Sequence, residues 1–187
     1  MNRIDIFNNT IDLLLSVKWT HKITAIHYDR LCKYDTVIKW CKICSSILSS
    51  GSIASLFAWN SLLSKIIAII GSLTFTATEL ISNKFLLEKN KVSLFNSKEE
   101  LWSISVELTS LARSINASSD EDNLMEFIDE YTEILNKVKN IQMGLPSASN
   151  KDIKKADKAI NTDHDDNNWE NKSSMLPPDL RKFNEEK

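Results

Sequence analysis

The stretch "KWCKICSSILSSGSIASLFAWN", residues 39–60, decides the fold, because it fits either a redox helix or a helix that enters a membrane. Cys41 and Cys44 have the C-x-x-C spacing of a thiol oxidoreductase, but the chain then runs for 22 residues, from Ile43 to Ser64, without a charge. A helix in a soluble protein rarely runs this far without charge, since its outer face meets water. The run therefore favours a membrane span.

A second apolar segment follows, and it has the length of a second span. Crossing ~30 Å of hydrocarbon takes about 20 helical residues, which residues 37–58 and 62–82 each supply, with a short turn near 58–61. Indole rings favour the two membrane interfaces, and a lysine near a helix end can extend to the interface. We therefore expect Trp40, Trp59 and Lys65 to be interface anchors.

The redox interpretation has less support from the surrounding sequence. A thioredoxin-like thiol needs a preceding strand and an exposed helix N-terminus that lowers its pKa, whereas the residues before Cys41 have a helical pattern. His21 and His27 lie 14 or more residues upstream, which is no zinc-ligand spacing. We interpret both cysteines as small apolar side chains. A thiol enzyme remains an alternative, which predicts loss of function when both become serine.

Composition narrows the class of protein further. Three glycines and three prolines in 187 residues favour helices over a turn-rich β fold. A net charge of −2 gives no support to nucleic-acid binding. Phosphate-loop, dinucleotide, zinc-protease and serine-hydrolase motifs are absent from the sequence. We therefore expect no enzyme, no catalytic residues, no metal site and no cofactor.

The segments around the spans have helical periodicity, so the sequence predicts an all-α fold: a membrane helical hairpin with long cytoplasmic helices that form a bundle or coiled coil. Residues 1–36 form one or two amphipathic helices with a stripe at Ile4, Phe7, Ile11 and Leu14. Residues 83–142 form a cytoplasmic helical hairpin, and residues 143–187 a mostly disordered tail. Capping boxes at 97–100 and 118–121 precede the apolar repeats Leu101, Ile104, Leu108, Leu111, Ile115 and Leu124, Ile128, Tyr131, Leu135, Val138.

Small polar residues recur along the spans at helical spacing. Small residues four apart allow helix backbones to approach closely in lipid, and we expect this role for Ser46, Ser50, Ala54, Ser64 and Ala68. The rival explanation is that the spans simply tolerate these small residues, which then have no packing role. A neighbouring stripe predicts a polar or packing face at Ser45, Ser49, Ser52, Ser72 and Thr76. One hairpin should not need both faces, so we infer that hairpins associate into a homo-oligomer.

Basic residues predict the topology of the hairpin. Lys33, Lys39 and Lys42 precede the first span, and Lys84, Lys89 and Lys91 follow the second. Since cytoplasmic loops carry the excess of lysine and arginine, we expect a multi-pass membrane protein with both termini in the cytoplasm.

The arrangement resembles the bacterial SLATT family, two-span membrane effectors of nucleotide-signalling defence systems. The resemblance covers roughly residues 10–142: "WTHKITAIHYDRLCKYDTVIKWCKICSSILSSGSIASLF", the second span and "KEELWSISVELTSLARSI". It implies an antiviral, abortive-infection effector that lies in the bacterial inner membrane and perforates or depolarises it. The implied partners are the lipid bilayer, further copies of the chain, and a sensor protein or cyclic nucleotide signal. The alternative is a membrane-anchored adaptor whose cytoplasmic helices bind a partner protein.

Overall fold

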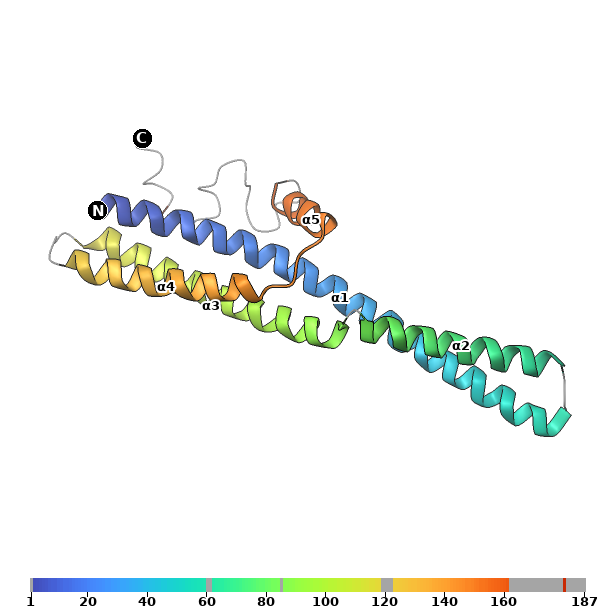
Figure 1. Cartoon of the computed structure of the whole chain (residues 1–187). Helices are drawn as coiled ribbons and strands as arrows, with labels where there is room; N and C mark the ends of the chain where they lie inside the picture. The colour runs from blue at the N-terminus through green and yellow to red at the C-terminus, as the bar shows by residue number, and fades with distance from the viewer. Residues whose placement is uncertain (1, 60–61, 85, 119–122, 162–179, 181–187) are drawn as a thin grey trace. The chain divides into compact units, whose positions relative to one another are not determined.

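The computed structural model is all-α and describes residues 2–59, 62–84, 86–118, 123–161 and 180 (Figure 1). No strand occurs within these ranges, which confirms the predicted fold class. The helices are α1 (Arg3–Trp59), α2 (Leu62–Lys84), α3 (Leu87–Ala117), α4 (Leu124–Gly144) and α5 (Asn150–Asn161). The chain divides into two compact units, which we call the bundle unit (Met1–Tyr28 with Ser93–Lys187) and the hairpin unit (Asp29–Val92).

The bundle unit is built on three helices that bury a shared apolar core. The N-terminal part of α1 lies beside α3 and α4, with α3 antiparallel to both (Figure 1). Apolar side chains at spacings of three and four place one stripe of each helix inward. The core comprises Ile6, Phe7, Ile11, Leu14, Leu15 and Val17 of α1, Leu101, Ile104, Leu108, Leu111, Ala112 and Ile115 of α3, Phe127, Ile134 and Val138 of α4, and Leu180.

The predicted apolar stripes match this core to different degrees. All five residues of the α3 repeat, from Leu101 to Ile115, are buried. On α4 the buried residues are Phe127, Ile134 and Val138. Of the predicted stripe only Val138 is among them, and its other residues lie at the edge of the buried face. Ile4 is 60% exposed, and Ile6 takes its place in the core at the first turn of α1. Periodicity therefore gave the buried face of α3 correctly, and on α1 and α4 it gave the face but not every residue at its centre.

The structure places helix caps at other positions than the two predicted capping boxes. A reciprocal cap begins α1: the Asn2 backbone N–H donates to Asp5 Oδ2 (3.0 Å), and the Asp5 N–H donates to Asn2 Oδ1 (2.8 Å). The box at 97–100 caps no helix, because α3 already begins at Leu87 and passes through it. The chain before it can stay helical since Leu87 and Leu94 are both buried. The box at 118–121 falls largely outside the described residues, and the N-cap of α4 is Asn123.

Part of the predicted disordered tail is helix α5, so the prediction of disorder was wrong for residues 150–161. Its start is a capping box that the sequence analysis missed. The Ser149 backbone N–H and hydroxyl donate to Asp152 Oδ2 (3.0 and 2.8 Å), and the Asp152 N–H donates to Ser149 Oγ (3.3 Å). Such a reciprocal cap satisfies backbone donors at the helix start and stabilises a short polar helix.

The hairpin unit pairs the later part of α1 with α2, which runs antiparallel beside it (Figure 1). α1 continues to Trp59 and α2 begins at Leu62, so the connection falls at the predicted turn, of which residues 60–61 lie outside the described part. Between α2 and α3, Leu86 has a φ of 45°. Its N–H donates to the Asn83 carbonyl (3.1 Å), and its carbonyl accepts from the Asn90 N–H (2.9 Å). A leucine thus occupies a left-handed turn position that glycine prefers.

Candidate functional site

Apolar side chains cover the outside of the hairpin unit. Where the bundle unit buries its leucines and isoleucines, the hairpin unit presents them outward, each with 39% or more of its surface exposed. An apolar surface of this extent marks contact with a partner or with lipid rather than water. Its residues are Val37, Trp40, Ile43, Ile47 and Leu48 of α1, and Leu62, Leu63, Ile66, Ile67, Ile69, Ile70, Leu73, Phe75, Leu80 and Ile81 of α2.

One stretch of the described chain is long and apolar enough to cross a membrane by length and composition. It lies within Lys65–Ala117, where an 18-residue window has a mean hydropathy of 1.4 and only 6% of that window is buried. A core helix of a soluble protein with the same composition would be mostly buried. Low burial is therefore the feature that favours lipid as the solvent of α2.

The residues of the predicted polar face do not share one environment. Ser45 is 4% exposed and lies inside the hairpin unit, whereas Ser72 and Thr76 are exposed on α2. The Thr76 hydroxyl donates to the Ser72 carbonyl (3.0 Å), and Thr74 and Thr78 bond to α2 carbonyls in the same way. Hydroxyls satisfied by their own helix need no water partner. The side chains of Ser49 and Ser52 lie outside the described residues.

The residues expected to pack closely or to anchor the spans are mainly on the surface of the single chain. Ser46, Ser50, Trp40 and Lys65 are exposed, and Ala68 is half-buried. The side chains of Ala54, Trp59 and Ser64 lie outside the described part of the structure. Gly71 of α2, which the sequence analysis did not single out, is buried like Ser45. Ser45 and Gly71 are thus buried small residues of the hairpin unit, while Ser46 and Ser50 lie on its surface.

The cysteines lie where a redox site would lack its electrostatic support. Cys41 and Cys44 are exposed free thiols in the middle of α1, and Cys32 is half-buried. A mid-helix position lacks the free backbone N–H groups of a helix N-terminus, which activate a reactive thiol. Within the residues that the structure describes, no group of three His, Cys, Asp or Glu side chains could hold a metal ion.

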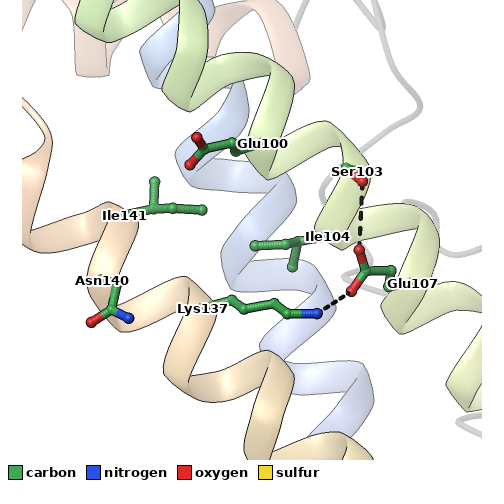
Figure 2. A pocket seen from close by; sticks show the side chains of 7 residues that line it. All are labelled: Glu100, Ser103, Ile104, Glu107, Lys137, Asn140 and Ile141. Carbon is green, nitrogen blue, oxygen red and sulfur yellow. Dashed lines mark hydrogen bonds and ion pairs between the residues drawn. The ribbon is translucent and has the colours of Figure 1, made fainter.

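A pocket of about 340 Å³ opens on the bundle unit between α3 and α4 (Figure 2). Ile104 and Ile141 contribute its apolar surface, and Glu100, Ser103, Glu107, Lys137 and Asn140 its polar surface. Glu107 is the centre of the polar contacts, since its carboxylate accepts from Ser103 Oγ (3.5 Å) and from Lys137 Nζ (3.3 Å). This pocket could not be predicted from the sequence, because the residues of α3 and α4 meet only in the folded bundle.

The charge of this pocket favours cations over anions. Among the described residues that line it, Lys137 is the single cation. It is held by two carboxylates, Glu133 at 3.0 Å and Glu107 at 3.3 Å. Hydrogen bonds to Glu133 and then Glu107 raise the pKa of Lys137 above its usual value. An anionic ligand would therefore meet an ammonium already neutralised by its neighbours and, beside it, the Glu100 carboxylate. The pocket suits a basic or neutral group.

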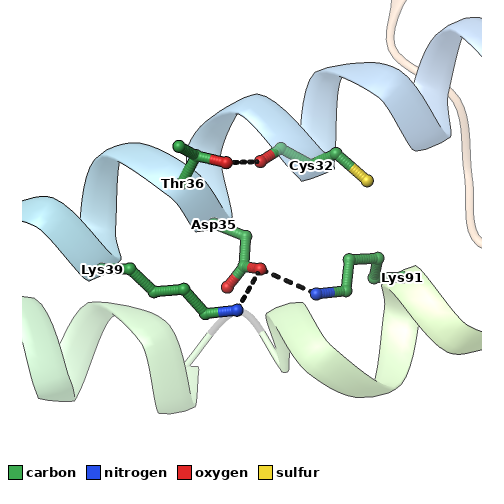
Figure 3. A network of polar contacts seen from close by, with 5 residues as sticks. All are labelled: Cys32, Asp35, Thr36, Lys39 and Lys91. Carbon is green, nitrogen blue, oxygen red and sulfur yellow. Dashed lines mark hydrogen bonds and ion pairs between the residues drawn. The ribbon is translucent and has the colours of Figure 1, made fainter.

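A charged cluster joins α1 to the start of α3 within the hairpin unit (Figure 3). Asp35 Oδ2 accepts from Lys91 Nζ at 2.7 Å and lies 2.9 Å from Lys39 Nζ. Its side chain is only 17% exposed. The hydrogen bonds from Lys91 and then Lys39 lower the pKa of Asp35, and the bond to Asp35 raises the pKa of Lys91. The i, i+4 spacing of Asp35 and Lys39 predicts an ion pair on one face of a helix. Nothing in the sequence indicated that Lys91 would also bind Asp35.

A second ion pair links the two helices of the hairpin. Lys42 Nζ lies 2.5 Å from a carboxylate oxygen of Glu79, which joins α1 to α2. Lys42 follows Asp35 by seven residues on α1, so the two charges lie on one face of the helix. Asp35 and Lys91 lie outside the predicted spans 37–58 and 62–82, whereas Lys42 and Glu79 lie inside them, within two turns of their ends. The polar boundary of the hairpin is therefore held by opposite charges rather than by isolated lysines.

A comparison with family models matches residues 12–171 to SLATT_4, described as the SMODS and SLOG-associating 2TM effector domain family 4. The match covers most of the chain and confirms the resemblance drawn from its sequence. Neither the curated proteins nor the solved structures provide a match.

Proposed function

The chain belongs to the SMODS and SLOG-associating 2TM effector domain family, and from this premise we propose that it perforates or depolarises a bacterial inner membrane as the effector of an antiviral, abortive-infection system. Membership of a family of two-span effector domains explains why the chain associates with a membrane. The exposed apolar surface of α2 and of the facing part of α1 carries the proposal, since lipid is the solvent that such a surface fits.

Assembly is part of this proposal. Two helices cannot enclose an aqueous path, so several hairpins have to lie side by side. Ser46 and Ser50 are exposed on α1, and Ser72 and Thr76 on α2, where small side chains would let neighbouring helices approach. In a resting assembly the hydroxyls of α2 stay bonded to their own helix. A signal that rearranges the helices would turn them toward water and open a leak.

Both spans are proposed to cross the membrane, with both termini in the cytoplasm. Support comes from the distribution of lysines at the open end of the hairpin, where Lys42 pairs with Glu79 and Lys91 with Asp35. Reporter fusions at residue 1, within the 58–61 turn and at residue 187 test this topology. The proposal requires cytoplasmic signals from both ends and an external signal from the turn.

Membrane potential is the direct test of the proposed activity. Induced expression with the activating defence system, followed with a potential-sensitive dye, should give depolarisation before growth stops. Replacing Ser45, Ser72 and Thr76 with leucine should reduce the depolarisation, whereas leucine at exposed Ser110 of the bundle unit should not. An intact potential under every activating condition contradicts the proposal, as does unchanged toxicity of the triple variant.

A membrane-anchored adaptor is the second candidate, and the pocket between α3 and α4 favours it. In this function the spans only hold the bundle unit at the membrane, and a partner protein binds the pocket. Replacing residues 37–82 with an unrelated two-span anchor distinguishes the two functions. An adaptor keeps its activity after the replacement, and a perforating effector loses it.

A further inference from the structure

Helix α5 carries a basic face that none of the functions above uses. Its four lysines are exposed, whereas Asp152 and Ala156 are buried. Spacings of three, four and seven residues place all four lysines within one stripe of the helix. The stripe consists of Lys151, Lys154, Lys155 and Lys158. Within the part of the chain that the structure describes, this cationic surface has no ion-pair partner.

The pocket between α3 and α4 carries the complementary charge. Glu100 and Glu107 line it from α3, and Glu133 extends the carboxylates on α4 through its bond to Lys137. Glu100 and Glu107 are seven residues apart, as are Lys151 and Lys158, so each pair spans about 10.5 Å of helix. A helix such as α5 laid along α3 would therefore align two lysines with two carboxylates, with Ser103 between them.

The two surfaces cannot meet within one chain. Figure 1 shows α5 on one side of α1 and the α3–α4 pair on the other, and Figure 2 shows the pocket on the side of α3 and α4 away from α1. Complementary patches on different faces of one molecule form head-to-tail contacts, which close into rings when the rotation between copies permits. The arrangement points to a second copy of this chain as the occupant of the pocket.

We infer that the basic face of α5 in one copy docks on the Glu100–Glu107 pocket of the next copy, so that bundle units assemble head to tail. The inference deepens the proposed function, on which it rests for the assembly of copies, and it names the contact between them. Charge complementarity favours a second copy over an anionic nucleotide, because Lys137 of the pocket is already bound by two carboxylates.

Charge reversal tests this contact in the full-length, detergent-solubilised chain. We expect Lys151→Glu with Lys158→Glu, and separately Glu100→Lys with Glu107→Lys, each to raise the concentration at half-dissociation about tenfold or more at low ionic strength. Light scattering measures the mass of the assembly. The single variant Glu100→Lys, which leaves the Glu107–Lys137 pair intact, should show the same direction if the double variant folds poorly. The control pair, Glu126→Lys with Lys139→Glu on exposed positions of α4, should leave the mass unchanged.

Rescue makes the test specific to a head-to-tail contact. A chain carrying both reversals has an acidic α5 and a basic pocket, and it should regain the assembly; so should a mixture of the two reversed chains. Absence of rescue, or wild-type mass in the reversed chains, overturns the inference. So does an outcome in which lysine reversal abolishes binding to anionic vesicles while the mass in detergent stays the same, since α5 would then bind lipid. Dye leakage from vesicles is measured separately, so that loss of leakage with intact assemblies counts against the proposed function alone.

Discussion

The ammonium of Lys91 lies 2.7 Å from a carboxylate oxygen of Asp35, a residue 56 positions earlier in the chain. The bond joins α1 to the first turns of α3, directly after the strained Leu86 turn. Lys39 binds the same Asp35 oxygen at 2.9 Å. The polar end of the hairpin therefore depends on a contact between residues that are distant in sequence.

Removing the Asp35 charge should weaken the hairpin. Asp35→Asn should lower the melting temperature of the detergent-solubilised chain by about 2–4 °C, the change that ~1 kcal/mol causes in a chain of this size. Asp29→Asn, at an exposed position on the same helix, is the control and should change nothing. If the pair is coupled, combining Asp35→Asn with Lys91→Met should lower the melting temperature by less than the sum of the two separate changes.

The same pair predicts a pH dependence. The pKa of Asp35 is lowered from 3.8, so its contribution to stability is present above pH 3.8 and is lost as the pH falls through the lower folded value. The difference in melting temperature between wild type and Asp35→Asn should therefore be constant near neutral pH and close in acid. A difference that persists below the folded pKa would show that the aspartate stabilises through packing instead of charge.

Glycine at position 86 should stabilise the chain. Leu86 has a φ of 45° and is 55% exposed, so the substitution removes strain and little buried surface. Left-handed backbone costs an L-residue roughly 1–2 kcal/mol, while glycine loses about 0.5–1 kcal/mol through greater freedom of the unfolded chain. We expect a small rise in melting temperature. Val92→Gly, at a 56% exposed helical position, should instead lower it, and equal effects of both variants would contradict the turn assignment.

The bundle core should respond strongly to a cavity. Leu108 is fully buried between α1, α3 and α4. Leu108→Ala should destabilise the chain by about 2–5 kcal/mol, measured by chemical unfolding followed by circular dichroism. Val106 is two residues away and 54% exposed, so Val106→Ala should stay within about 0.5 kcal/mol. Similar losses for both variants would contradict the assigned orientation of α3.

Local sequence features predicted the helices better than the contacts between them. The charge-free runs gave the connection between α1 and α2 and the start of α2, although α1 runs unbroken from Arg3 and does not begin at residue 37. A regular 3-4 repeat gave the buried face of α3. Both signals come from contiguous residues. Capping boxes were less reliable: 97–100 lies inside α3, while the box at Ser149–Asp152, which does start a helix, went unnoticed in a polar segment. The Asp35–Lys91 bond and the α3–α4 pocket were beyond reach, since each needs the fold to bring distant residues together.

Membrane extraction shows whether lipid solvates the exposed apolar side chains of α1 and α2, on which the proposed function depends. Cells expressing the full-length chain are lysed without detergent, and the membrane pellet is washed with alkaline carbonate. We expect the chain to stay in the pellet and to be released only by detergent. Recovery of the native chain in the supernatant, before or after the carbonate wash, would contradict it.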